Sequence, residues 1–434
     1  MSAAWVVERT LASRAPSSEF LNSALRRCHE RDHGLLRELS LGTLRWMRRI
    51  DHVISGASHR PFDRIEPALL APLRVAAYQL LFLDRVPDHA AVREGVEHAR
   101  RLTHKGGASF SNAVLRNIAR RSKLAQWPVE VSDPVQRLAI ENSHPDFLVR
   151  RWHDRLGERR TRALLEANNR PKPLQLLAFR DRGGRELLAE DLIDEGVAVE
   201  PSAISPVGLL VRRGNPLHSP SFGRGVFYLQ DEASQAAALL PAPKPGERVL
   251  DAAAAPGGKS FALVAAEPEV KVFLADVSPP RLDSVRANLR RLGRRLPLFA
   301  ADAGRPASRG GFDRVILDLP CTGTGTLRKN PELKWRISES EIGRLTTQSL
   351  RLLEGMAAQV AVGGLLCCIT CSLEPEENED VMSLFFERHP EFVPLDLEEH
   401  LGWPLERWVF GQGAWRILPA GDHDGFTVHV AVRK

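Results

Sequence analysis

Two cysteines that each follow a predicted buried strand are the residues of this sequence best suited to covalent chemistry. Cys321 ends the run 316–321, in which it is preceded by Asp318, Leu319 and Pro320, and Cys371 follows the apolar run 365–369. A thiolate is a strong nucleophile, and a carboxylate beside it can hydrogen-bond a substrate. The pattern therefore predicts a site at which two thiols and an acid meet one substrate.

Simpler interpretations exist for the cysteines. Cys28, Cys367 and Cys368 are expected to be buried apolar residues without a chemical role. Cys321 and Cys371 could also be core thiols, but each adjoins a polar, turn-like stretch, which argues against that. Cys368 and Cys371 form a C-x-x-C pair. Because no second pair or histidine cluster accompanies them, we expect no metal or redox site.

A glycine-rich loop, 251–259, follows one predicted strand and opens a predicted helix. Glycines let the backbone approach a ligand closely, and a helix N-terminus presents unpaired N–H groups. Asp276 ends the next predicted strand, 18 residues beyond Gly258, where an acid usually binds ribose hydroxyls. Asp302 and Asp318 end two further predicted strands. This series indicates a nucleoside cofactor lying across the carboxyl ends of the strands.

The elements that must position these residues alternate between strand and helix from Gly246 onward. Such alternation predicts a mostly parallel sheet covered on both faces by helices. The predicted strands are 249–250, 272–274, 315–317, 365–369 and 427–432. Ser338 and Glu341 form a capping box, and we expect the helix that begins there to reach Ala361, where Gly363 and Gly364 end it.

Residues 5–125 are predicted to be helical, because apolar residues recur at intervals of three and four. We expect helix ends at Pro61, Pro67, Pro72 and Pro87. This part carries 21 Lys and Arg against 12 Asp and Glu, and arginines share helix faces at 45, 48 and 49 and at 116, 120 and 121. The charge favours nucleic acid as a partner over an ordinary solvated surface.

Between these parts the pattern is mixed. Residues 174–179, 197–199 and 226–229 resemble short strands, 186–195 a helix, and 208–225 a turn-rich stretch. The sequence therefore predicts three domains: a helical domain 1–125, a small α+β linking module 126–240 and a catalytic α/β domain 241–434.

The totals limit the class of protein. Of 434 residues, 43% are apolar, which is a globular composition. No apolar run of 18 residues and no signal-peptide core is present, so we expect a cytoplasmic protein without a membrane span. Five cysteines, unevenly spaced, do not indicate a disulfide framework.

The front part resembles the RNA-binding domain related to the antitermination factor NusB. Three blocks carry the resemblance in the same order: Leu39–Trp46, Val86–Val92 and Ser111–Asn117. They imply an RNA-binding role for residues 1–125.

The rest of the chain resembles the bacterial Sun/Fmu-type (RsmB) family of 16S ribosomal RNA cytosine-5 methyltransferases. The glycine loop, Asp318–Cys321, Thr324–Pro331 and Thr370–Asn378 carry this resemblance. Ala253 stands where many members have cysteine, and Leu319 where alanine is common, which bears at most on cofactor packing. The fold implied is a Rossmann-like methyltransferase domain, and the cofactor implied is S-adenosylmethionine.

By resemblance, Cys371 is the nucleophile that adds to carbon 6 of a cytosine, and Cys321 assists removal of the carbon 5 proton. Asp318 would hydrogen-bond the base, and Lys259 would orient the base or lower a thiol pKa. The cofactor-binding residues implied are Ala253, Ala254, Ala255, Pro256, Gly257, Gly258, Lys259, Asp276, Arg281, Asp302 and Asp318. The implied partner is RNA, most simply 16S ribosomal RNA bound by a monomer without a metal.

Other functions stay open at this point. A methyltransferase acting on nitrogen usually offers an aromatic residue after its prolines, and 318–321 lacks one. A non-catalytic RNA-binding factor would not need both thiols. Transfer RNA remains an alternative substrate, although the front domain favours ribosomal RNA.

Overall fold

The computed structural model describes residues 2–103, 105–306, 310–397 and 413–434. The chain forms two compact units. We call Met1–Arg170 with Leu327–Arg336 the helical unit, and Pro171–Thr326 with Ile337–Lys434 the sheet unit. The boundaries of the three predicted domains stay a prediction.

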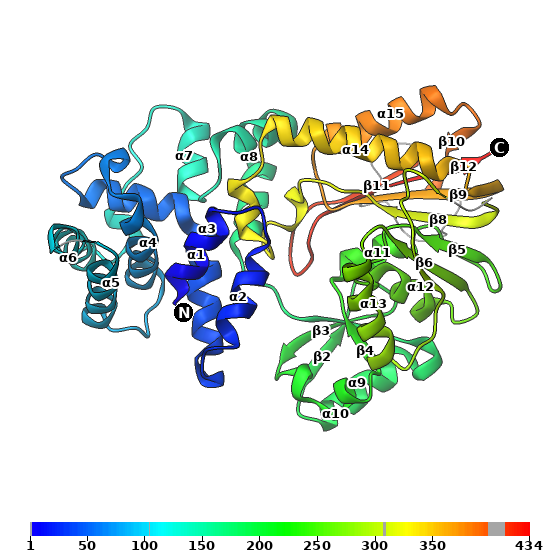
Figure 1. Cartoon of the computed structure of the whole chain (residues 1–434), viewed down its shortest axis with the longest axis horizontal. Coiled ribbons are helices and arrows are strands. Elements are labelled where there is room, and N and C mark those ends of the chain that lie inside the picture. The colour runs from blue at the N-terminus through cyan, green and yellow to red at the C-terminus, as the bar shows by residue number, and fades with distance from the viewer. Residues whose placement is uncertain (1, 104, 307–309, 398–412) are drawn as a thin grey trace. The chain divides into compact units, whose positions relative to one another are not determined.

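The helical unit is built from amphipathic helices (Figure 1), as the spacing of apolar residues predicts. Ile50, Leu73 and Leu115, from three different helices, are fully buried in its core. The α-helices are α1 (Ala3–Leu11), α2 (Ser17–Leu25), α3 (His33–Ala57), α4 (Pro67–Phe82), α5 (Asp88–Leu102), α6 (Lys105–Arg120), α7 (Pro134–Glu141) and α8 (Asp146–Asn169). Short 3-10 helices are η1 (Glu30–Asp32), η2 (Phe62–Arg64), η3 (Leu124–Gln126) and η7 (Pro331–Trp335).

One proline prediction is wrong. Pro72 lies inside α4 and is buried, whereas Pro67 starts that helix. Residues 69–80 of α4 are mostly buried and apolar, so tertiary packing outweighs the hydrogen bond that proline removes from the helix.

The sheet unit begins with a four-stranded antiparallel sheet in the order β2-β3-β1-β4. Its strands are β1 (Gln175–Ala178), β2 (Ala198–Pro201), β3 (Gly208–Arg213) and β4 (Phe227–Leu229), accompanied by η4 (Arg180–Arg182), α9 (Gly184–Asp194), η5 (Pro216–His218), α10 (Pro220–Gly223) and α11 (Glu232–Leu239). The prediction of turns from residue 208 onward is wrong, because 208–213 is the strand β3. Its apolar residues are buried against β1, a partner distant in the sequence.

The second sheet has eight strands in the order β10-β12-β9-β8-β5-β6-β7, with β11 paired to β12 (Figure 1). Its strands are β5 (Arg248–Asp251), β6 (Lys271–Asp276), β7 (Leu298–Ala300), β8 (Phe312–Asp318), β9 (Val360–Thr370), β10 (Phe392–Pro394), β11 (Ala414–Ile417) and β12 (Phe426–Arg433). The ladders from β7 through β6, β5 and β8 to β9 are parallel, and those that involve β12 are antiparallel.

Helices α12 (Gly258–Ala266), α13 (Pro279–Arg291), α14 (Glu339–Ala357) and α15 (Glu379–Arg388), with η6 (Thr324–Thr326) and η8 (Pro375–Glu377), complete the unit. Ser338 caps α14 as predicted, by accepting from the Glu341 N–H. The predicted end of α14 is wrong: the helix stops at Ala357, and residues 360–364 belong to β9. The predicted fold class is confirmed.

Among the helices in the described ranges, none is long and apolar enough to cross a membrane.

Candidate active site

The parallel pairing of β8 with β9 brings the two predicted thiols together. Asp318, the last residue of β8, pairs in register with Ile369 of β9. Cys321 follows Asp318 by three residues, and Cys371 follows the end of β9 directly. Their sulfur atoms are 3.5 Å apart and share a hydrogen bond. The geometry therefore allows both thiols to contact the same substrate atoms.

Hydrogen bonds hold the two cysteine loops in place. The Gly325 N–H donates to the Cys371 carbonyl oxygen over 2.8 Å, which ties one loop to the other. Glu377 binds Thr322, the neighbour of Cys321, through both carboxylate oxygens: one accepts from the backbone N–H (2.8 Å) and one from the hydroxyl (2.6 Å). Burial raises the pKa of Glu377. Sequence reasoning assigned this glutamate no role, because its partner lies 55 residues away.

The two thiols are electrostatically different. The hydrogen bond with Cys321 lowers the pKa of Cys371, although burial opposes this effect. The same hydrogen bond, together with burial, raises the pKa of Cys321 well above its usual range. Cys371 is therefore the group that ionises first, and once it is a thiolate the Cys321 thiol is the donor to its sulfur. This is the arrangement of one activated nucleophile and one protonated neighbour.

Lys259 and Asp318 form an ion pair beside the thiols. Burial alone would lower the pKa of Lys259, but the charge and hydrogen bond of Asp318, together with the charges of Asp251 and Cys371, more than offset it, and the net pKa is raised. The Lys259 cation also lowers the pKa of Cys371. Lys259 stays charged in this position and stabilises a thiolate.

The glycine loop enters α12 through Gly257, whose φ of +110° lies in the left-handed region. A Cβ atom at this position would lie 2.4 Å from the Phe261 ring. Only glycine adopts this positive φ readily and leaves room for the Phe261 ring. The loop can therefore take this path because residue 257 has no side chain. The loop is also fixed to the sheet, because the Ala254 N–H donates to the Ala275 carbonyl oxygen (2.8 Å).

A cavity of about 330 Å³ lies at the carboxyl ends of the strands and reaches both thiols. Five predicted cofactor-binding residues line it: Ala253, Asp276, Arg281, Asp302 and Asp318. The other six, Ala254, Ala255, Pro256, Gly257, Gly258 and Lys259, form the loop and the helix start behind it and are not among its lining residues.

The polar side chains that line this cavity fit a nucleoside. Asp276 is 1% exposed, and each of its carboxylate oxygens accepts one backbone N–H, from Ser278 (3.0 Å) and from Ala255 (3.3 Å). A carboxylate oxygen has a second lone pair, so Asp276 keeps acceptor capacity for two hydroxyl groups. Arg281 steadies it, with a nitrogen–oxygen distance of 3.5 Å.

Arg351 is a lining residue that sequence reasoning missed. It reaches the cavity from α14, and one of its nitrogens lies 3.2 Å from an Asp302 oxygen. Its hydrogen bond holds the pKa of Asp302 below the usual range. No sequence signal identifies it, because one arginine on an amphipathic helix resembles any other.

The remaining cysteines lie away from this chemistry. Cys367 and Cys368 are buried within β9, as expected. Burial raises the pKa of both thiols, which keeps them protonated. Cys28 lies half-buried in the helical unit.

Comparison with known proteins identifies the family to which this chain belongs. Residues 237–430 match the family described as 16S rRNA methyltransferase RsmB/F, residues 4–120 the NusB family, and residues 144–218 the ferredoxin-like domain of RsmF/B-like methyltransferases. The ribosomal RNA small subunit methyltransferase B of Pseudomonas syringae pv. tomato is 34% identical over 431 residues, which cover 98% of this chain and 95% of that protein. The chain belongs to the ribosomal RNA small subunit methyltransferase B family.

Other members and solved structures agree with that membership. The probable methyltransferase B of Bacillus subtilis is 33% identical over 90% of this chain and 88% of its own length. The crystal structure of PH0851 covers 99% of this chain and 98% of its own, with a TM-score of 0.80 and 26% identity. A methyltransferase homologue from Pyrococcus horikoshii covers 70% of this chain and 100% of its own, with a TM-score of 0.59 and 25% identity. The predicted resemblance is confirmed, and S-adenosylmethionine is the cofactor of this methyltransferase family.

Proposed function

We propose that this member of the methyltransferase B family transfers a methyl group to carbon 5 of a cytosine in ribosomal RNA of the small subunit. The observation that carries the proposal is the sulfur pair, 3.5 Å apart, in which one thiol has a lowered pKa and the other a raised one. Methylation at a nitrogen or an oxygen would not need two thiols at one point. Addition to a pyrimidine ring and later release of the product do need them.

Cys371 starts the reaction as a thiolate. Its sulfur forms a bond to carbon 6 of the cytosine, and the electron pair of the C5–C6 double bond moves into the ring and makes carbon 5 nucleophilic. Asp318, at the end of β8, hydrogen-bonds the base in this proposal, and its ion pair with Lys259 balances its charge. The target base must leave its stack to reach this position.

Carbon 5 then accepts the methyl group. When bound, S-adenosylmethionine supplies that group as an activated sulfonium methyl. Asp276, Asp302 and Arg281 would hold the cofactor in the cavity that also reaches Cys371. The product of this step is a neutral ring that carries both the new methyl group and the original hydrogen on carbon 5.

Cys321 completes the reaction. Once Cys371 has become a neutral thioether, its thiolate no longer raises the pKa of Cys321 through its hydrogen bond and its charge, so this pKa falls although burial still raises it. Cys321 then loses its proton to solvent, and its thiolate removes the proton from carbon 5. The C5–C6 double bond reforms and Cys371 leaves as a thiolate, so one proton is released in each cycle.

The test is covalent trapping on small-subunit ribosomal RNA with purified full-length variants. In Cys321→Ala the adduct forms but is not resolved, so we expect an RNA–protein band that survives denaturing electrophoresis. Cys371→Ala should give no such band, and Cys28→Ala is the matched thiol control. A stable adduct in both active-site variants would contradict the assigned roles.

Nucleoside analysis of the methylated RNA decides the reaction class. We expect 5-methylcytidine. A methyl group on nitrogen, preferential methylation of transfer RNA, or RNA binding without methyl transfer would each replace the proposal by one of its alternatives.

A further inference from the structure

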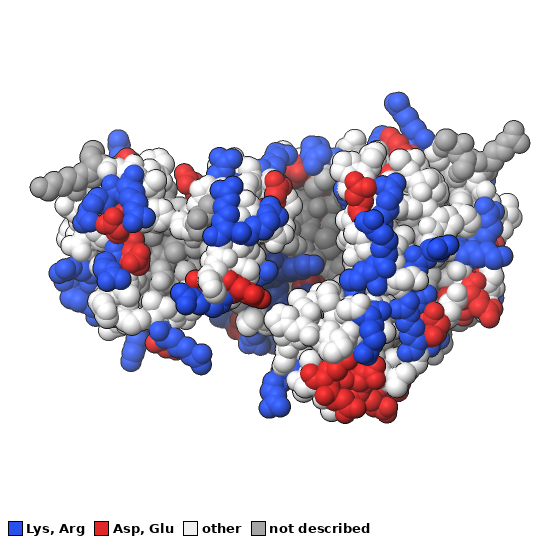
Figure 2. All heavy atoms as spheres, turned by 60° about the horizontal axis from the view of Figure 1, so that its bottom comes forward, with Lys and Arg blue, Asp and Glu red and all other residues white. Residues whose placement is uncertain are grey.

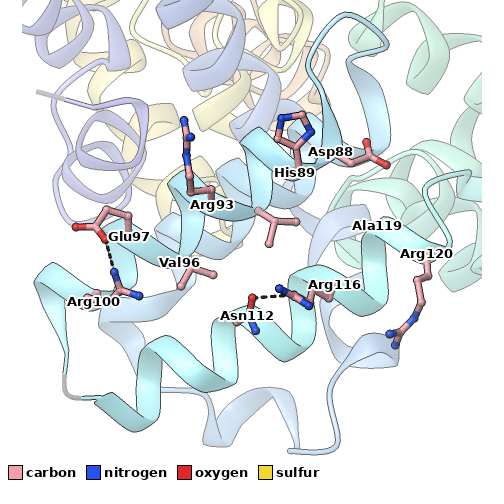
Figure 3. A pocket seen from close by; sticks show the side chains of 11 residues that line it. Asp88, His89, Arg93, Val96, Glu97, Arg100, Asn112, Arg116, Ala119 and Arg120 are labelled. Carbon is pink, nitrogen blue, oxygen red and sulfur yellow. Dashed lines mark hydrogen bonds and ion pairs between the residues drawn. The ribbon is translucent and has the colours of Figure 1, made fainter.

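A pocket on the helical unit, distant in sequence from the thiols, lies between α5 and α6 (Figure 3). Its volume is about 660 Å³. Figure 3 shows Val96 directed toward the space between the two helices, while Arg93 and Arg120 extend outward from opposite sides. The pocket therefore has an apolar floor and cationic rims.

Three of the guanidinium groups around this pocket have no strong carboxylate partner. The Arg120 side chain has no hydrogen bond or ion pair with any part of the chain that the structure describes. Arg116 donates to the neutral Asn112 side chain (3.1 Å), so its charge is not balanced. Arg93 lies 3.3 Å from Glu94, but both side chains are about 70% exposed, and such a pair contributes little.

Two acidic residues, Asp88 and Glu97, line the pocket against four arginines, and Glu97 is largely neutralised. Glu97 binds Arg100 over 2.5 Å and lies 3.4 Å from Arg101. The pocket is thus a local excess of positive charge on a unit whose surface is rich in Lys and Arg (Figure 2, left part of the view). An anionic ligand would find cations already oriented toward solvent.

The floor between the rims is apolar. Val92, Val96 and Ala119 line it and are only partly buried. An apolar surface flanked by cations and by the Asn112 amide fits an unstacked base whose neighbouring phosphates lie on the rims. A continuous duplex would hold its bases inside the stack and could not use this floor.

We propose that the α5–α6 pocket binds single-stranded RNA, with phosphates on Arg93, Arg116 and Arg120 and one base on the floor. The choice of RNA as the polyanion rests on the proposed function. Within that function the pocket is a second contact point for the substrate, separate from the sulfur pair, and it adds affinity without taking part in methyl transfer.

The test measures binding of a fluorescent single-stranded RNA of about twelve nucleotides, without self-complementarity, to the full chain at several salt concentrations. The variant is Arg116→Gln/Arg120→Gln. We expect its affinity to fall at least about fivefold at low salt, and the slope of log K against log[salt] to become shallower by about 1.4, since each lost phosphate contact removes about 0.7.

A matched variant, Arg26→Gln/Arg37→Gln, removes the same charge from exposed positions of the helical unit outside the pocket. Its slope of log K against log[salt] should equal that of the wild-type protein. Ala119→Leu fills the floor without changing charge, so we expect weaker binding with an unchanged slope. The proposal is overturned if both double variants behave alike, if Ala119→Leu binds normally, or if a duplex or an acidic polyglutamate peptide binds the pocket equally well.

This experiment is independent of the chemistry proposed above. Cys371→Ala should abolish methyl transfer but bind the RNA with wild-type affinity, whereas Arg116→Gln/Arg120→Gln should raise the RNA concentration needed for half-maximal methylation. Methylation of a different atom would contradict the proposed function without affecting the binding result. Unchanged RNA binding in the pocket variant would contradict only this inference.

Discussion

At the scale of single residues, one hydrogen bond gives two identical side chains different pKa values. Cys321 and Cys371 have the same intrinsic chemistry, but their shared hydrogen bond lowers the pKa of Cys371 and raises that of Cys321. Lys259 adds to the effect by placing a cation near Cys371. Local charge and the shared hydrogen bond thus make Cys371 the more acidic of the two thiols, in agreement with its proposed role as the nucleophile.

Removing the donor should weaken the nucleophile. In Cys321→Ala the largest cause of the lowered Cys371 pKa is lost, so the pKa rises and less thiolate is present at a given pH. We expect the midpoint of Cys371 alkylation by iodoacetamide, followed by peptide mass spectrometry, to move up by about one pH unit, the equivalent of one hydrogen bond to a charged group. Cys28→Ala should leave it unchanged, and a lower midpoint in Cys321→Ala would refute the assigned direction.

Glu377 should act through Cys321 as a positioning residue. Glu377→Gln keeps the shape, but an amide nitrogen cannot accept, so one of the two Thr322 donors loses its partner. We expect methyl transfer to slow by about tenfold or more and the Cys371 alkylation midpoint to rise, less than in Cys321→Ala. The control is Glu387→Gln on the exposed face of α15. If the rate falls while the midpoint stays fixed, Glu377 does not position Cys321.

At the scale of elements, the site depends on where strands end and how the following loops are held. The parallel register of β8 and β9 delivers both thiols to one edge of the sheet. The loop after β5 reaches the same edge and turns into α12 at Gly257. Side chains from α12, α14 and η8 then fix the charges and loops around the thiols.

A methyl group at residue 257 should damage the cofactor site. Gly257→Ala must adopt a positive φ and also displace Phe261, which a Cβ atom would approach to 2.4 Å. Gly246→Ala is the control, because its φ is also positive (+81°) but no atom lies within 4 Å of the added Cβ. By calorimetry we expect at least about tenfold weaker S-adenosylhomocysteine binding for Gly257→Ala than for Gly246→Ala. Equal binding would show that the path of the loop does not matter.

At the scale of the whole molecule, each of the two units is built from two segments that are not adjacent in the sequence. The chain leaves the sheet unit after Thr326, contributes Leu327–Arg336 to the helical unit, and returns at Ile337. Lys334 is fully buried there and donates to the carbonyl oxygens of Arg45 (3.1 Å) and Ser143 (3.2 Å) and to the Asn169 amide oxygen (2.7 Å). The segment that follows the Cys321 loop is therefore part of the helical core.

The helical unit should recognise this segment in trans. Fragment 1–170 contains the apolar core around Ile50 and Leu73, and a peptide spanning 327–336 should bind to it with a change in Trp335 fluorescence, because the Trp335 indole N–H donates to the Leu44 carbonyl oxygen (2.8 Å). The Lys334→Met peptide should bind about tenfold or more weakly, since three oxygen atoms lose the hydrogen bond from the Lys334 ammonium group. Equal binding of the two peptides would show that Lys334 contributes no net stabilisation.

The sequence by itself determined the fold class, because apolar periodicity and strand–helix alternation are local patterns. It also indicated the residues with chemical potential, Cys321, Cys371, Asp318 and Lys259, through motif resemblance. Their roles stay a proposal.

Only the tertiary structure decided which groups meet. The 3.5 Å sulfur contact joins residues 50 positions apart, and Glu377, Arg351 and Lys334 gain their partners from other elements. Burial likewise turned Gly208–Arg213 into a strand and kept Pro72 inside a helix. Local patterns fix what a segment can form, whereas pairing, burial and pKa depend on neighbours that the chain brings together only by folding.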